Sequence, residues 1–159
     1  MKQLFDHIWN SKWALTLLAG LLLGFSWPPV PLPFLVFPAF LLVFRIIDLS
    51  NSAREAAFWT YPGFVIWNIL TTYWLVMATV AGGVAAILAN AAVMTLPVML
   101  QYKLQKQGYR PWLLALLQAA CWLSYEYLHH QWDLAWPWLT IGNAWANVPE
   151  LVQYISVTG

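Results

Sequence analysis

The sequence predicts an all-α protein of the polytopic membrane class, a transmembrane helix bundle of five spans plus the start of a sixth, with a cytoplasmic N-terminus. Composition is the first reason. Of the 159 residues, 62% are apolar and only 8% are charged, whereas about 25% of the residues of a soluble domain are charged. The spacing of the charges is the second. Uncharged runs cover 32 residues after Lys12, 47 after Glu55 and 15 from position 111 to 125, and roughly 20 apolar residues cross a bilayer.

The first uncharged run is too long for one span and is predicted to form a hairpin. Four prolines lie within residues 28–33, and a helix interior does not accommodate proline. We therefore expect two short spans, near residues 10–25 and 34–49. A cleaved signal peptide is the alternative for the first of them. Residues 24–28, Gly-Phe-Ser-Trp-Pro, make a poor cleavage site, so the segment is interpreted as a span.

The second uncharged run also needs a turn, which residues 79–83 provide. This stretch ends in Gly82-Gly83, and small, flexible residues favour a turn. The predicted spans lie near residues 56–78 and 83–101. A fifth span is expected near residues 111–128, because Pro111 suits the first position of a helix.

The rest of the chain is not predicted to cross the membrane. Residues 129–149 form a Trp-rich segment, expected on the outer side, whose apolar residues are too interrupted for a span. Residues 150–159 begin a further helix that is shorter than the roughly 20 residues of a crossing. We expect residues 1–159 to form one N-terminal transmembrane domain, without a soluble domain or an internal repeat.

The basic residues predict the orientation. With five crossings, all seven fall on one side, which the positive-inside rule assigns to the cytoplasm. They are Lys2, Lys12, Arg45, Arg54, Lys103, Lys106 and Arg110.

Charge and cysteine content exclude several functions. The net charge of +1 provides no basic surface for nucleic acid. The single cysteine, Cys121, allows neither an internal disulfide nor a thiolate metal site. We therefore expect no nucleic-acid partner, no metal and no cofactor.

Glu126 is the most informative polar residue. It lies 15 residues after Pro111, about 22 Å along the fifth span, and an acid at membrane depth is a functional-site hypothesis by default. A structural role remains open beside it, in which Glu126 pairs with His129 or His130 one turn later.

The other polar residues within the spans favour structural roles. Three amides, Asn68, Asn90 and Gln118, lie near the middles of predicted spans, where hydrogen bonds between helices are a better interpretation than a substrate path. Cys121 has no base near it in sequence, so it is interpreted as a buried small apolar residue. The adjacent residues His129 and His130 point about 100° apart on a helix, and interfacial histidines are favoured over metal ligands.

The segment 136–139, Trp-Pro-Trp-Leu, allows two interpretations. It is either an interfacial anchor or part of a wall that contacts lipid in the outer leaflet, with indole N–H groups reaching the headgroups. The sequence by itself favours the anchor.

Several motifs together resemble the membrane region of the apolipoprotein N-acyltransferase family. The most specific are Trp122 and Glu126, followed by residues 136–139 and Gly142-Asn143. Residues 24–28, 73–76 and 82–83 resemble the first hairpin, the third span and the turn of that family. Two positions differ. His129 stands where the family has arginine, and residues 135–136 are Ala-Trp in place of Gly-Phe.

The resemblance implies an enzyme of the bacterial inner membrane. Such enzymes transfer an acyl chain from phospholipid to the N-terminal cysteine amine of a diacylglyceryl lipoprotein, through a thioester. The catalytic Glu, Lys and Cys belong to a nitrilase-like domain that these 159 residues do not include. We thus expect no catalytic residue and no activity from this chain alone. The candidate lipid- or substrate-binding residues are Glu126, Trp136, Trp138 and Trp74.

The alternative class is a small non-enzymatic integral membrane protein that acts as a subunit or adaptor. A transporter component is disfavoured, because the chain lacks an internal repeat and paired charges within the spans.

Overall fold

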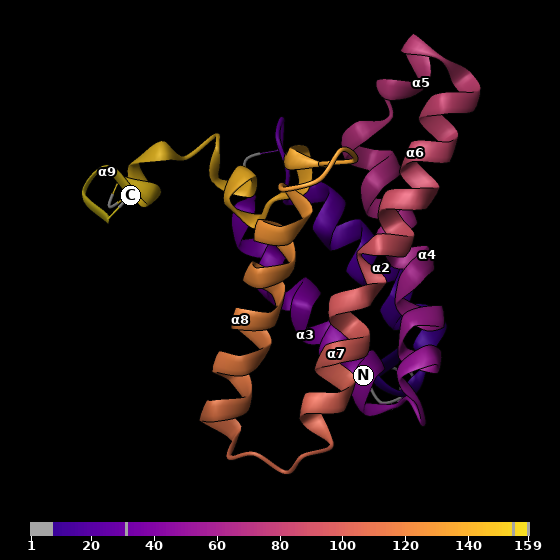
Figure 1. Cartoon of the computed structure of the whole chain (residues 1–159), viewed down its shortest axis with the longest axis vertical. Coiled ribbons are helices and arrows are strands. Elements are labelled where there is room, and N and C mark those ends of the chain that lie inside the picture. The colour runs from indigo at the N-terminus through magenta and orange to yellow at the C-terminus, as the bar shows by residue number, and fades with distance from the viewer. Residues whose placement is uncertain (1–7, 31, 154, 159) are drawn as a thin grey trace.

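A computed structural model describes residues 8–30, 32–153 and 155–158, and the described residues form helices and turns without a strand. The prediction of an all-α fold is confirmed. The longer helices are α2 (Lys12–Phe25), α3 (Val36–Asp48), α4 (Ala53–Thr72), α6 (Val80–Val93), α7 (Thr95–Gln105) and α8 (Pro111–His129). The short elements are α5 (Leu75–Ala78), α9 (Ile155–Thr158) and four 3-10 helices, η1 (Pro33–Leu35), η2 (Pro137–Leu139), η3 (Ile141–Trp145) and η4 (Pro149–Val152). Figure 1 shows the long helices running side by side, with α8 at the margin of the group.

One helix in the described part of the chain is long and apolar enough to cross a membrane. Helices α6 and α7 follow each other as a single 26-residue helix, Val80–Gln105, which is about 39 Å long and contains an 18-residue stretch with a mean hydropathy of 2.0. Helix α2 is apolar but has 14 residues, about 21 Å, and α3 has 13. The five-span arrangement therefore stays a prediction.

Of the predicted turn at residues 79–83, only Thr79 lies outside a helix, because α5 ends at Ala78 and α6 begins at Val80. Thr79 is the N-cap of α6 and its hydroxyl accepts a hydrogen bond of 2.9 Å from the Gly82 amide. Both glycines consequently belong to the first turns of α6. Gly83 serves close packing, because a Cβ atom there would come within 2.6 Å of the Val76 nitrogen in α5. The predicted span 56–78 is divided into α4 and α5, which are separated by Tyr73 and Trp74.

Helices α2 and α4 approach each other closely through glycine. A Cβ atom on Gly20 would lie 2.6 Å from the carbonyl oxygen of Gly63, so only glycine allows this distance. The Thr16 hydroxyl crosses the same interface and donates a hydrogen bond of 2.6 Å to the Trp59 carbonyl. Small residues and a hydroxyl are typical of helix contacts inside membranes.

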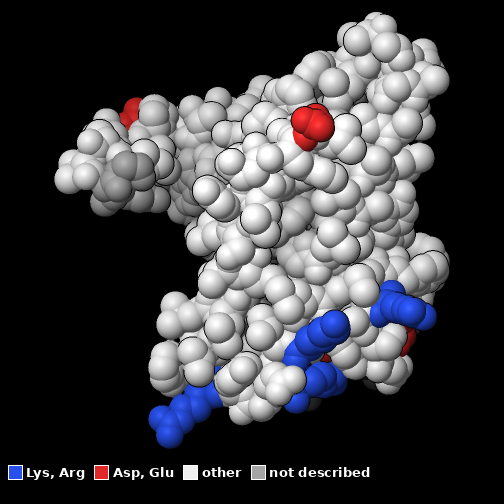
Figure 2. Space-filling model, in the orientation of Figure 1, with Lys and Arg blue, Asp and Glu red and all other residues white. Residues whose placement is uncertain are grey.

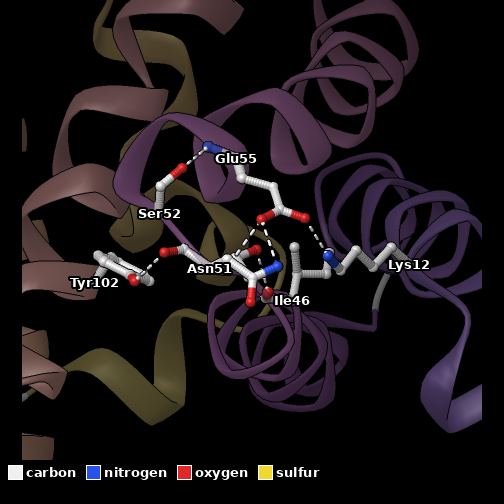
Figure 3. Close-up of polar contacts among 7 residues, drawn as sticks. Lys12, Ile46, Asn51, Ser52, Glu55 and Tyr102 are labelled. Carbon is white, nitrogen blue, oxygen red and sulfur yellow. Dashed lines mark hydrogen bonds and ion pairs between the residues drawn. The ribbon is translucent and has the colours of Figure 1, made fainter.

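The basic side chains on the face shown in Figure 2 gather at one end of the molecule, called the basic end below. In Figure 3, α2, α4 and the turn between α3 and α4 meet there. Lys12 forms an ion pair with Glu55, and Glu55 also accepts a hydrogen bond of 2.7 Å from the Asn51 amide. The Tyr102 hydroxyl of α7 donates one of 2.7 Å to the Asn51 carbonyl. These bonds join three long helices at the end that is predicted to face the cytoplasm. Lys2 lies outside the described residues.

The chain after α8 is irregular. Residues 137–152 contain three short 3-10 helices, and Pro137 and Pro149 occupy first positions in two of them. The helix expected to begin at residue 150 is not continuous, because η4 ends at Val152 and α9 has four residues. In Figure 1 this last part extends sideways from the helices, beyond the end of α8 that is remote from the basic end.

Candidate functional site

Glu126 connects α8 to the irregular segment that follows it. The side chain is buried, with 8% of its surface exposed. Its Oε1 atom accepts hydrogen bonds of 2.9 Å from the Trp122 indole, one turn earlier, and 2.9 Å from the Ile141 amide. These partners differ from the His129 or His130 pairing considered from the sequence. The carboxylate thus holds the start of η3 against α8.

The three candidate tryptophans lie together beyond the end of α8. The Trp138 ring contacts Trp74 and Trp136 edge-on, each at a centroid distance of 5.4 Å. The Trp138 carbonyl accepts a hydrogen bond of 3.0 Å from the indole of Trp27, in the turn after α2. Trp74 and Trp138 are exposed, whereas the Trp136 indole nitrogen is buried with no hydrogen-bond partner among the described residues. The cluster therefore presents the apolar faces of Trp74 and Trp138, while the indole nitrogen of Trp136 stays enclosed.

A chain of hydrogen bonds lies next to this cluster and joins α4, α6 and α8. The Asn90 amide donates a bond of 2.7 Å to the Asn68 side-chain oxygen. The His129 Nε2 atom lies 2.9 Å from the Asn90 Oδ1 atom, and the Trp132 indole donates a bond of 2.8 Å to His129 Nδ1. The prediction that Asn68 and Asn90 bond between helices is confirmed.

Three cavities surround His129. A cavity of about 10 Å³ is lined by Glu126, His129 and Trp136, among others, which is close to the least space that holds one water molecule. A groove of about 420 Å³ lies between α7 and α8 and is mainly apolar, and we call it the α7–α8 groove. A groove of about 280 Å³ lies between α6 and residues 132–138, and we call it the α6 groove.

The remaining polar candidates form contacts within the fold and do not form a reactive group. The Cys121 thiol is buried and lies 3.6 Å from the Pro97 carbonyl, to which it donates. Among the described residues, Gln118 takes part in an interhelical bond only through its backbone carbonyl, which accepts a hydrogen bond of 3.3 Å from the Gln101 side-chain amide. His130 is exposed at the end of α8, where its Nε2 atom lies 3.2 Å from the Thr140 hydroxyl.

Sequence reasoning missed the two residues that organise this region. His129 was interpreted as interfacial, yet it is 7% exposed and hydrogen-bonded on both ring nitrogens. Trp27 was considered only within residues 24–28, which resemble the first hairpin of the family, yet it packs against Trp67 at 4.7 Å and bonds to residue 138. A signal for His129 was available, because Asn90 and His129 both lie in apolar segments, where polar groups require partners.

The fold and this site define an all-helical protein in which a buried carboxylate, a bonded amide–histidine chain and a group of tryptophans meet beside two apolar grooves. The comparisons specify the family. Residues 19–159 match the model of the apolipoprotein N-acyltransferase N-terminal domain, so the chain belongs to this family.

A curated relative agrees with this assignment. Over 160 aligned residues the chain is 34% identical to apolipoprotein N-acyltransferase of Chlorobaculum tepidum. The alignment covers 97% of this chain and 29% of the relative, so the chain spans less than a third of that protein. No solved structure matches the chain.

Proposed function

We propose that this chain is the membrane portion of an apolipoprotein N-acyltransferase, the class of enzyme that transfers an acyl chain from phospholipid to the N-terminal cysteine amine of a lipoprotein. The observation that carries the proposal is the family match over residues 19–159. The end remote from the basic end supports it, because the tryptophans and the α6 groove lie there, and the α7–α8 groove adjoins them.

In this proposal five segments cross the bacterial inner membrane, near the predicted ranges 10–25, 34–49, 56–78, 83–101 and 111–128. The basic end faces the cytoplasm, as the positive-inside rule requires. The tryptophan cluster then lies at the outer interface, where indole rings are favoured. Short helices such as α2 are compatible with this arrangement if the bilayer thins around them or flanking residues extend to the interface.

The proposed role of the site is to receive lipid. The faces of Trp74 and Trp138 are exposed and suit contact with acyl chains. The indole nitrogen of Trp136 is enclosed and unpartnered among the described residues, and the small cavity beside this residue has space for about one water molecule. Glu126 holds the Ile141 amide and so fixes the segment that carries Trp136 and Trp138. The partners are a phospholipid acyl donor and a diacylglyceryl lipoprotein.

These residues do not supply the chemistry of acyl transfer. A thioester requires an activated thiolate with a base in hydrogen-bond reach. Cys121 is the single cysteine of the sequence, and its thiol contacts a backbone carbonyl. The 159-residue chain is therefore proposed to be inactive alone, and the nucleophile belongs to the part of the relative that the alignment does not cover.

A chimera tests this function. In the Chlorobaculum tepidum relative, the aligned N-terminal region is replaced by this chain, and the chimera is expressed in cells depleted of their own acyltransferase. Mass spectrometry of a reporter lipoprotein should show a third acyl chain with the chimera, also with Cys121→Ala, and none with the 159-residue chain alone. Loss of activity in a chimera that accumulates normally would contradict the proposal and favour a non-enzymatic membrane subunit. A third acyl chain formed with this chain alone would contradict the inactive-fragment part.

A further inference from the structure

The hydrogen-bond chain that ends at Trp132 has a fixed direction. An indole nitrogen only donates, so the bond from Trp132 requires a lone pair on His129 Nδ1. The hydrogen of the neutral ring then lies on Nε2, from which it is donated to Asn90 Oδ1, 2.9 Å away. Asn90 donates to Asn68, which donates in turn a bond of 2.8 Å to the Phe64 carbonyl. Every member has its partner, and His129 is the link that holds the Trp132 indole.

Trp132 stands where the two apolar grooves meet. The α7–α8 groove and the α6 groove share Val93, His129 and Trp132 as lining residues. The rest of the α7–α8 groove continues towards the basic end as far as Leu100. The α6 groove continues the other way as far as Ala86. The Trp132 ring is consequently part of the wall between two stretches of one surface path.

The length of this path matches a lipid tail only when both grooves are joined. Each groove follows seven residues of helix, from Val93 to Leu100 or to Ala86, which is about 10 Å. One leaflet of a bilayer contains roughly 15 Å of hydrocarbon, half of the core thickness. Each groove alone thus holds part of an extended acyl chain, and the two together, about 21 Å, hold all of it.

We propose that Trp132, held in place by His129, is a specificity-determining barrier that sets how far the acyl chain of a membrane phospholipid extends along α6 and α7. An acyl chain that enters the α6 groove beside residues 133–138 stops at the Trp132 ring. When the ring is released, the chain continues into the α7–α8 groove. The inference rests on the proposed function for its lipid occupant, and it names the residue pair that limits the depth of that occupant.

Two substitutions of His129 separate the two bonds of its ring. The His129→Asn side chain places its carboxamide oxygen near the position of Nδ1, where it can still accept from Trp132. The His129→Gln side chain places its amide near Nε2, so it can still donate to Asn90 and does not reach Trp132. His130→Gln is the matched control, because His130 is the exposed neighbour and is bonded to Thr140.

The first measurement follows the Trp132 ring itself. The 159-residue chain is labelled with 5-fluorotryptophan in phospholipid nanodiscs, and Trp132→Phe identifies its ¹⁹F signal. We expect the Trp132 signal to shift and change width in His129→Gln, and to stay near its original position in His129→Asn and His130→Gln. An unchanged signal in folded His129→Gln would show that His129 does not hold the Trp132 ring in place.

The second measurement locates the end of the lipid tail. The nanodiscs contain a phosphatidylethanolamine whose palmitoyl chain carries a diazirine at its last carbons, and cross-linked peptides are identified by mass spectrometry. In the original chain the cross-links should favour Asn90 and Val93, the part of the α6 groove next to the Trp132 ring. In His129→Gln and in Trp132→Ala they should move several-fold towards Leu96 and Leu100, and His129→Asn should resemble the original.

The same distribution in all variants would overturn the barrier, and so would an original chain whose cross-links avoid the α6 groove. Trp132→Ala carries the test if His129→Gln does not accumulate. The outcome is independent of catalysis. If the chimera fails in the acylation assay but the cross-links shift in the variants as expected, the proposed function is disproved and the barrier is not. If the chimera is active but the cross-links do not shift in the variants, the barrier is disproved and the proposed function is not.

Discussion

The indole N–H of Trp27 donates a hydrogen bond of 3.0 Å to the carbonyl oxygen of Trp138, and so joins two residues 111 positions apart in the chain. Trp27 is 4% exposed and also packs against Trp67. The turn after α2 thereby fixes the backbone of the tryptophan cluster. A residue from the first hairpin determines the position of a ring that lies far later in the sequence.

Trp27→Phe should loosen residues 136–139 without disturbing the hydrophobic contacts of the hairpin. Phenylalanine keeps an aromatic ring against Trp67 but lacks the donor, which leaves the Trp138 carbonyl without that bond and costs about 1 kcal/mol of unfolding free energy. Limited proteolysis and thermal unfolding in detergent measure the two effects. The control is Trp13→Phe at the other end of α2, which keeps an edge-on contact with Trp59. Equal proteolysis of the two variants in the segment after α8 would contradict the assignment.

Glu126→Gln and Glu126→Ala should separate the charge of this residue from its role as an acceptor. Glutamine retains an oxygen for the Trp122 indole and the Ile141 amide, so the chimera should accumulate normally. A neutral amide accepts these bonds more weakly than a carboxylate does, so the segment that carries Trp136 and Trp138 should be held less firmly and acyl transfer should be slower. Alanine leaves both donors without their acceptor, a cost of about 1–3 kcal/mol for each buried group, and should lower accumulation as well.

Trp138→Ala is the companion variant in the same chimera. It removes exposed aromatic surface from the proposed lipid contact and should slow transfer more than it lowers accumulation. Immunoblots and mass spectrometry of the reporter lipoprotein measure the two quantities in the same cells. If transfer falls only in proportion to accumulation in both Glu126→Gln and Trp138→Ala, the two residues act in folding alone.

Local rules predicted the helices well and their contacts poorly. The prolines at 28–33, Pro111 and the small residues at 79–83 identified where helices end and begin, because these effects act within a few residues. The contact of Glu126 with Ile141 could not be predicted, since Ile141 reaches it only through the fold of residues 130–140. The role of His129 could not be predicted either, because its bond to Asn90 joins residues 39 positions apart.

The ion pair between Lys12 and Glu55 at the basic end should make the stability of the fold depend on pH. The hydrogen bond from Lys12, followed by that from the Asn51 amide, lowers the pKa of Glu55 from 4.5 to about 2. A carboxylate with a lowered pKa stabilises the fold fully above its ordinary value of 4.5, and loses that contribution as the pH falls towards 2. Since Glu55 is at the surface, salt should weaken the effect.

Glu55→Gln should consequently lower the midpoint of thermal unfolding at pH 7 and flatten its decline between pH 5 and about 3. The measurement is unfolding in a non-ionic detergent at low salt and again at about 1 M salt, where charges are screened within about 3 Å. Glu150→Gln changes an exposed acid of η4 and serves as the control. A parallel decline with pH in Glu55→Gln and the original chain would show that the pair does not contribute.

Single cysteines in a Cys121→Ala background should report the proposed orientation. Val80 lies in the first turn of α6 and is 69% exposed, and a Cβ atom on Gly142 meets nothing within 4 Å, so both positions accept a cysteine. Gly82 is less suitable, because its Cβ atom would lie 2.7 Å from the Thr79 hydroxyl. The exposed Gln107, in the turn between α7 and α8, represents the basic end.

The measurement uses cells whose outer membrane has been permeabilised and whose inner membrane is intact. A membrane-impermeant maleimide should label Val80→Cys and Gly142→Cys in these cells. Gln107→Cys should react only after the inner membrane is disrupted, because the positive-inside rule holds the basic end in the cytoplasm. Labelling of Gln107→Cys before disruption, with protection of the other two, would invert the topology and move the tryptophan cluster to the cytoplasmic side, where the proposed lipid site would have no access to the outer leaflet.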